Sequence, residues 1–163
     1  MKKIVFIFLT VSLFLGFALL FDFQRFSKAG CAFCDEKVLD AQVFYRGDGV
    51  FGVLTHKPAV PGHVLIIPER HVERFEDLTT EEVAALGEAI KKVDLAVRRT
   101  FGNEDYVLLQ KNGRGAGQSV PHVHFHYLPA TKFLPFHFFL SPWLKPMKSE
   151  ETKRVRDVLS ESF

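Results

Sequence analysis

The chain has 163 residues, of which 47% are hydrophobic, and its formal net charge is +2 at pH 7. This length allows one folded domain with short appendages. The near-balanced charge, without a dominant basic stretch, argues against nucleic-acid binding through phosphate neutralisation as the main activity.

The N-terminal segment has the composition of a membrane-spanning helix. Two lysines precede residues 4–21, a run that carries no charge and consists mostly of Ile, Val, Leu and Phe. A run of this length can cross a bilayer. A cleaved signal peptide is the alternative, but the apolar run is long for one and no A-x-A-like cleavage site follows it. We therefore expect residues 1–30 to form a single-pass membrane anchor and a linker.

The segments after the linker have strand character. Residues 42–46 and 50–55 flank Gly47-Asp48-Gly49 and predict a β-hairpin. Residues 63–67 predict a buried strand that ends at Pro68, because proline cannot donate a hydrogen bond to a sheet.

One long helix comes next. Thr79 and Glu82 fit the Thr-x-x-Glu capping box, and Gly102 marks the C-terminal end. Between them, apolar residues recur at three- and four-residue steps: Val83, Leu86, Ile90, Val93 and Val97. Residues 105–110 predict a further strand. Strands grouped around one amphipathic helix predict an α+β domain with a mainly antiparallel sheet.

Residues 120–128 contain three histidines that alternate with apolar residues. This is a strand period, so we expect His122, His124 and His126 to share one face, with Val123 and Phe125 on the other. The outer imidazoles of such a strand lie roughly 13 Å apart, so the three rings cannot all serve one small ligand. A glycine-rich turn, residues 112–119, leads directly into this segment, and glycine lets the backbone approach an anion closely.

Three blocks of the sequence together resemble the histidine triad (HIT) family of nucleotide hydrolases and transferases. They are the Cys31-Ala32-Phe33-Cys34 opening, the Pro58-x-x-Pro61-Gly62-His63 block that runs on to Pro68 and His71, and Ala116-Gly117-Gln118-Ser119-Val120 followed by the three alternating histidines. The blocks occur in the family's order and span roughly residues 31 to 130.

The resemblance implies a HIT-like fold, a homodimer and a reaction at the α-phosphate of a nucleotide. It implies that His124 is the nucleophile, forming a nucleotidyl-imidazole intermediate, and that His126 binds the phosphate and assists the leaving group. His122 completes the catalytic triad, and His63 matches the histidine that supports it. The expected substrate-binding residues are Asn112, Gly117, Gln118 and Ser119.

Two positions depart from the family pattern. Thr55 stands where the family often has an aspartate that grips the ribose, and Ala130 replaces a common arginine. The Thr55 position keeps open a second interpretation, that the protein is a membrane-tethered nucleotide-binding protein without turnover. A third, a metalloenzyme with three histidine ligands, is disfavoured by the spread of the histidines along a strand.

Cys31 and Cys34 suit a tetrahedral zinc site, and the resemblance implies that His71 and His122 are the other two ligands of a structural zinc. The alternatives are a disulfide or two ordinary thiols. The two N-terminal lysines favour a cytoplasmic N-terminus, which would put the domain outside, where thiols oxidise. A hydrolase of cytoplasmic nucleotides would face inward, so the side of the membrane stays open.

The C-terminal part divides into two stretches. Residues 133–144 are apolar and broken by prolines, and they need cover from a dimer partner, the nucleotide pocket or the membrane interface. Residues 149–163 predict a solvated, charged terminal helix. The expected organisation is therefore an anchor at 1–30, a HIT-like domain at 31–148 and a charged tail at 149–163.

Overall fold

The computed structural model describes residues 30–130 and 145–163. The anchor expected at residues 4–21 and the apolar stretch at 133–144 both lie outside these ranges. Among the described residues, no helix combines the length and the apolar character needed to cross a bilayer. The compact unit of the fold runs from Phe33 to Phe163.

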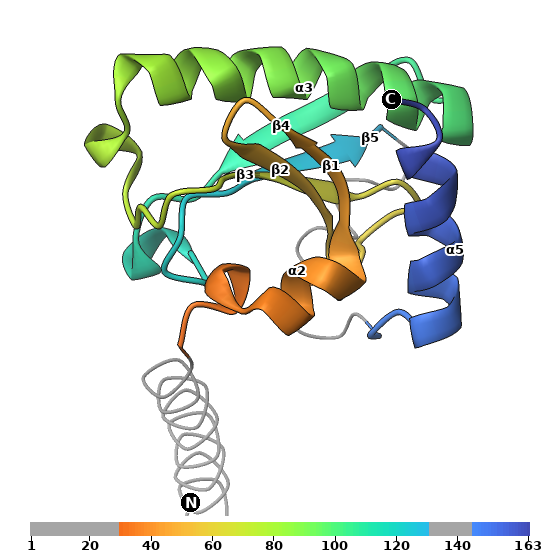
Figure 1. Ribbon diagram of the computed structural model, residues 1–163, viewed down its shortest axis with the longest axis horizontal. Coiled ribbons are helices and arrows are strands. Elements are labelled where there is room, and N and C mark those ends of the chain that lie inside the picture. The colour runs from red at the N-terminus through yellow and green to blue at the C-terminus, as the bar shows by residue number, and fades with distance from the viewer. Residues whose placement is uncertain (1–29, 131–144) are drawn as a thin grey trace, which may run out of the picture. The chain divides into compact units, whose positions relative to one another are not determined.

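A five-stranded sheet in the order β1-β2-β3-β5-β4 forms the centre of the unit, and every neighbouring pair is antiparallel (Figure 1). The strands are β1 (Val43–Gly47), β2 (Val50–Leu54), β3 (Val64–Pro68), β4 (Tyr106–Gln110) and β5 (Phe125–Pro129). The predicted hairpin is confirmed: Asp48 and Gly49 both have positive φ, as a two-residue hairpin turn requires.

Helix α3 (Thr80–Phe101) lies along one face of the sheet (Figure 1). The predicted capping box is present, because the Thr79 side chain accepts from the Glu82 N–H and the Glu82 side chain accepts from the Thr79 N–H. Gly102 ends the helix in the left-handed conformation. The predicted stripe is buried at Leu86, Val93 and Val97, whereas Val83, in the first turn, is exposed.

The two faces of the sheet carry different chemistry. Val64, Ile66 and Tyr127 belong to the apolar core that α3 covers. Because side chains alternate along a strand, Leu65 and His126 point to the opposite face. The α3 face therefore supplies the packing, and the opposite face is left for the histidines.

Short helical elements complete the unit, and one of them, α2 (Glu36–Gln42), was not predicted. Asp35 caps α2 by accepting from the Lys37 N–H. The others are single 3-10 turns: η1 (Ala32–Cys34), η2 (Phe75–Asp77) and η3 (Arg114–Ala116).

The expected C-terminal helix is present as α5 (Ser149–Ser160), but the prediction that it is solvated is wrong for one face. Leu159 is fully buried in the α3 core, and α5 contacts β1, α2 and α3. The Phe163 ring lies 4.7 Å from that of Tyr45, centroid to centroid. The apolar side chains on this face of α5 therefore cover one end of the core.

The histidine strand is shorter than expected. Strand β5 begins at Phe125, so His126 lies in the strand while His122 and His124 precede it. The chain before Phe125 instead bends, with the His122 N–H on Val120 O and the Val123 N–H on Val72 O. Pro121 has no N–H to offer a sheet, which is consistent with this late start.

Candidate active site and metal centre

His63 and His126 form a hydrogen-bonded pair whose proton positions follow from the backbone. The Ala59 N–H donates to His63 Nδ1 at 3.0 Å, so a neutral His63 carries its proton on Nε2. That proton is donated to His126 Nδ1 at 3.0 Å. His126 is therefore held with its own N–H on Nε2, where it is a hydrogen-bond donor.

Both rings of this pair are kept neutral. Burial lowers the pKa of His63 to about 4. Burial also lowers the pKa of His126 to about 3, with smaller contributions from His63, His124 and the charge of Lys111. At neutral pH, His63 and His126 are therefore both uncharged and are joined by a hydrogen bond.

The loop that carries His63 depends on Gly62. This residue has a φ of +79°, and a Cβ added to it would lie 2.9 Å from Pro129 Cγ and 3.0 Å from Phe101 Cδ2. A side chain is therefore excluded both by conformation and by space. Pro61-Gly62-His63 brings the loop against the end of β5 and so aims His63 at His126.

His124 is oriented by the main chain of the segment itself. Its Nδ1 lies 2.6 Å from the carbonyl oxygen of His122, which can only accept, so Nδ1 carries the proton and Nε2 the lone pair. The ring is buried, which lowers the pKa of His124. The Phe33 ring packs edge-on against it at 5.5 Å between centroids. This arrangement leaves a neutral imidazole with Nε2 as its nucleophilic atom.

The glycine-rich turn is fastened to the histidine segment through Gln118. The side chain of Gln118 is buried, accepts from the Gly113 N–H at 2.6 Å, and donates to Glu73 O and to His122 O. The carbonyl oxygen of His122 therefore accepts hydrogen bonds from both Gln118 and His124. Gln118 was predicted to bind substrate, but its side chain holds the glycine-rich turn to the histidine segment. Of the other predicted substrate-binding residues, Gly117 ends η3 in the left-handed conformation and Ser119 is exposed.

Asn112 is directed elsewhere. Its side-chain oxygen accepts from the Phe75 N–H at 2.9 Å and its nitrogen donates to Glu76 Oε2 at 2.6 Å. The contacts of this predicted nucleotide-binding residue therefore join the turn to η2. The residue before it, Lys111, was not singled out in the sequence, yet its charge contributes to the lowered pKa of His124 and His126.

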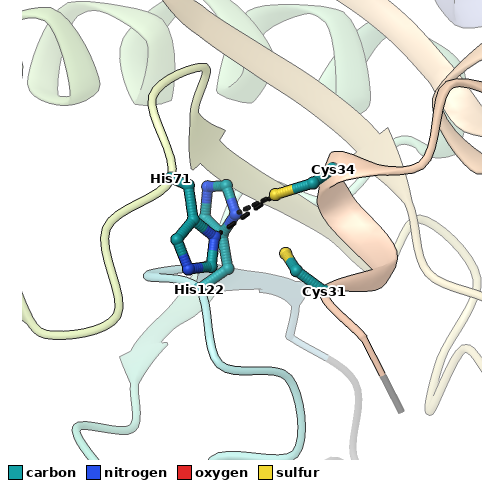
Figure 2. A group of neighbouring side chains, drawn as sticks. All are labelled: Cys31, Cys34, His71 and His122. Carbon is teal, nitrogen blue, oxygen red and sulfur yellow. Dashed lines mark hydrogen bonds between the residues drawn. The ribbon is translucent and has the colours of Figure 1, made fainter.

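The four predicted metal ligands converge. Figure 2 shows the side chains of Cys31, Cys34, His71 and His122 gathered together, and their ligand atoms all lie within 4.8 Å of one another. Cys34 Sγ lies 3.2 Å from His71 Nδ1 and 3.7 Å from His122 Nδ1. Two sulfur atoms and two imidazole nitrogens converge here, so the arrangement favours the metal-ligand interpretation over a disulfide or two ordinary thiols.

The surroundings of the two imidazoles fit a metal. His122 Nε2 lies 2.9 Å from the carbonyl oxygen of Pro68 and must carry the proton, which leaves the Nδ1 lone pair facing Cys34. His71 Nε2 lies 3.8 Å from Glu73 Oε1, which is beyond hydrogen-bond distance. The Pro68 carbonyl is the outer hydrogen-bond partner that orients His122, and two thiols with two imidazoles suit tetrahedral zinc.

Phe33 is a structural link that the sequence did not reveal. It lies between the two cysteines, and its buried ring contacts His122 as well as His124, at 5.8 Å and 5.5 Å between centroids. The His122 ring of the Cys/His cluster and the His124 ring therefore share one aromatic neighbour. A phenylalanine within a Cys-x-x-Cys motif gives no sequence signal of this contact.

Comparisons with known proteins agree with these features. The family profile described as the HIT domain matches residues 36–133. An asymmetrical bis(5'-nucleosyl)-tetraphosphatase of Schizosaccharomyces pombe is 40% identical over 92 residues, 56% of this chain and 50% of that protein. An adenosine 5'-monophosphoramidase of the same species is 43% identical over 72 residues, 44% of this chain and 51% of that protein. The chain thus matches about half the length of each.

A solved structure also shares the fold. The crystal structure of a Zn-bound histidine triad family protein from Mycobacterium smegmatis superposes with a TM-score of 0.63 at 26% identity, covering 80% of this chain and 94% of that chain. The fold, the family profile and the ordered histidine segment lead to one conclusion. The chain is a member of the HIT family.

Proposed function

We propose that the protein is a nucleotide hydrolase that cleaves the bond between an α-phosphate and its leaving group through a covalent intermediate on His124. The single observation that carries this proposal is the 2.6 Å contact between His124 Nδ1 and the carbonyl oxygen of His122. It places the proton on Nδ1 and the lone pair on Nε2, and it does so before any substrate binds. An imidazole held in one tautomer is an activated nucleophile for phosphorus.

The reaction has two steps. Nε2 of His124 attacks the α-phosphorus, a P–N bond forms, and the bond to the leaving group breaks with its electron pair passing to the leaving group. Water then attacks the same phosphorus, and the P–N bond breaks to release the nucleotide. The Nε2–H of His126 and the exposed Ser119 at the end of the glycine-rich turn would donate to the phosphoryl oxygens. The N–H groups of Gly113, Ala116, Gly117 and Gln118 already donate within the turn.

The names of the two curated relatives indicate which substrates to test. One describes a bis-nucleosyl tetraphosphate and the other a nucleoside monophosphoramidate. Both contain an α-phosphate with a leaving group, so a single nucleophile at His124 would serve either. The alternative of nucleotide binding without turnover would appear as binding of both compounds and cleavage of neither.

The test uses the full-length chain and its His124→Ala variant with both compounds. The variant should lose roughly 10⁴-fold or more in turnover, as expected when a covalent nucleophile is removed. His56→Ala is the matched control, because His56 is an exposed histidine outside the site and should retain the wild-type rate. Equal rates for the wild type and His124→Ala would contradict the mechanism.

We also propose that Cys31, Cys34, His71 and His122 hold one structural zinc ion. The ion would bind the η1 turn to the residue whose carbonyl orients His124. Zinc held by four protein ligands supplies folding free energy, and no step of the reaction passes through it.

Two further proposals concern assembly. Strand β4 is one of the two outer strands of the described sheet and exposes Tyr106, Val107 and Leu108, which supports pairing with β4 of a second copy. Mass measurement of the full-length protein in solution tests this homodimer.

Residues 4–21 are proposed to anchor the chain in a membrane, on the basis of composition alone. Retention in washed membranes, with protease protection, tests the anchor and its side.

A further inference from the structure

Lys111 lies next to the histidine segment in the fold. It directly follows β4, whose residues Leu109 and Gln110 pair with His126 and Phe125 of β5. Lys111 follows the last residue of β4 and His124 precedes the first residue of β5, so both residues lie at the same end of this strand pair.

The ammonium group of Lys111 lies against the glycine-rich turn. A Cβ added to Gly117 would be 3.6 Å from Lys111 Nζ and 3.7 Å from its Cδ. The side chain therefore reaches from the end of β4 to the turn that ends at Ser119, the proposed phosphate donor. The charge of Lys111 acts on both His124 and His126. These relations put a cation close to the turn and to the two imidazoles.

The polar residues around the turn are directed to partners of their own. Asn112 directs its amide to Phe75 and Glu76. Arg74 is paired with Glu76, and Arg70 makes two 2.7 Å contacts with Glu82, so carboxylates locally balance their charges. The positive charge of Lys111, close to Gly117, His124 and His126, has a use in phosphoryl transfer.

We propose that Lys111 binds the phosphate chain of the substrate and favours leaving groups that carry negative charge. This inference rests on the proposed function, since it assigns a preference to the same site. A dinucleoside polyphosphate releases a phosphorylated nucleotide, whose leaving oxygen gains negative charge as the bond to the α-phosphorus breaks. A nucleoside phosphoramidate releases an amine, which carries no negative charge after protonation. A fixed ammonium stabilises the first transition state more than the second.

The experiment compares kcat/KM for a bis-nucleosyl tetraphosphate and for a phosphoramidate of the same nucleoside. Lys111→Gln removes the charge and keeps most of the length, Lys111→Arg keeps the charge, and Lys91→Gln, an exposed position on α3, is the control. We expect Lys111→Gln to lose roughly 10- to 100-fold on the tetraphosphate, the effect of one charge-assisted contact, and less than about threefold on the phosphoramidate. Lys111→Arg and Lys91→Gln should stay close to the wild type on both.

A second measurement needs no substitution. In the wild-type chain, a non-hydrolysable dinucleoside polyphosphate should protect the Lys111 amine from acylation, while a nucleoside phosphoramidate analogue should protect it less.

The outcomes separate the two levels of the proposal. Equal losses on both substrates, no loss on either, or equal protection by the two analogues would overturn the role of Lys111 while leaving the proposed function intact. A wild-type protein that cleaves neither substrate and forms no adduct on His124 would overturn the proposed function, and the inference with it.

Discussion

His122 and His126 are four positions apart in the sequence, but their imidazole rings make opposite hydrogen bonds. The Nε2 of His122 donates to Pro68 O, so its Nδ1 lone pair turns to Cys34 and the metal-ligand group. The Nδ1 of His126 accepts from His63, so its Nε2–H turns outward as a donor. In each of the two histidines, the hydrogen-bond partner of one ring nitrogen decides whether the other nitrogen is a donor or carries the lone pair.

His124 joins these two regions. Its Nδ1 donates to the carbonyl oxygen of His122, the residue whose ring belongs to the metal-ligand group. The metal region (Cys31, Cys34, His71 and His122) can therefore influence the reaction region (His63, His124 and His126) only through geometry. It does so by holding the His122 carbonyl and Phe33 in place. We expect changes in the metal region to affect stability first, and changes in the reaction region to affect turnover first.

The largest effect on stability should follow loss of the metal. A chelator, or Cys34→Ser, should lower the free energy of unfolding by about 4 kcal/mol, the stabilisation given by a ligand at 1,000 times its Kd. Urea denaturation with and without added zinc measures this difference. The two treatments should not add, because both remove the same interaction.

His56→Ala is the control for this measurement, since His56 is exposed and outside the ligand group. A wild-type protein without copurified metal, whose unfolding a chelator does not change, would show that the cluster is not a metal site. A mass lower by two hydrogens would then identify a disulfide between Cys31 and Cys34.

The next largest effect is a dependence of stability on pH in the reaction region. The pKa of His63 is about 4 in the folded protein and 6.5 in the unfolded chain, so the unfolded chain binds more protons between these values. Stability is therefore full above pH 6.5 and is lost as the pH falls toward 4. His63 alone should account for about 2 kcal/mol between pH 7 and pH 5.

His63→Asn isolates this contribution. Asparagine offers an oxygen to the Ala59 N–H in place of Nδ1 but does not titrate in this range. The free energy of unfolding of the variant should fall less between pH 7 and pH 5 than that of the wild type. Identical pH profiles for the two proteins would show that His63 is not held neutral by burial.

The smallest effect is expected on the α3 face. Tyr127 follows His126 in the sequence but points to the opposite side, where its hydroxyl donates to Asp94 Oδ1 at 2.6 Å. Tyr127→Phe should cost about 1 kcal/mol of stability, the net value of one hydrogen bond. The kcat/KM of the variant should change by less than about twofold. A large loss of turnover with little loss of stability would contradict the conclusion that the α3 face of the sheet serves packing and not the reaction.

Local signals in the sequence predicted the elements whose structure is decided locally. The Asp48-Gly49 turn, the Thr79–Glu82 capping box and the Gly102 helix end need only neighbouring residues to form. The metal-ligand group joins segments that are distant in the sequence, and its four residues were predicted only because the family pattern supplied them. Helix α2 is too short to show a period, and it depends on the Asp35 cap.

Other features depend on contacts between distant segments. The late start of β5 reflects the bond between Val123 and Val72, and the burial of Leu159 reflects a core assembled from α3 and the sheet. The position of Lys111 follows from the pairing of β4 with β5. No local pattern marks these residues, so only the folded arrangement reveals them.

The most direct test of the account is the identity of the atom that carries the intermediate. The wild-type protein would be mixed with an α-phosphate-labelled substrate and quenched in base, since phosphohistidine is labile in acid, and the labelled peptide would be sequenced and its linkage isomer determined. The tautomer set by His122 O predicts one nucleotidyl group on Nε2 of His124. Label on Nδ1 of His124, label on His126, or turnover without any histidine adduct would contradict it.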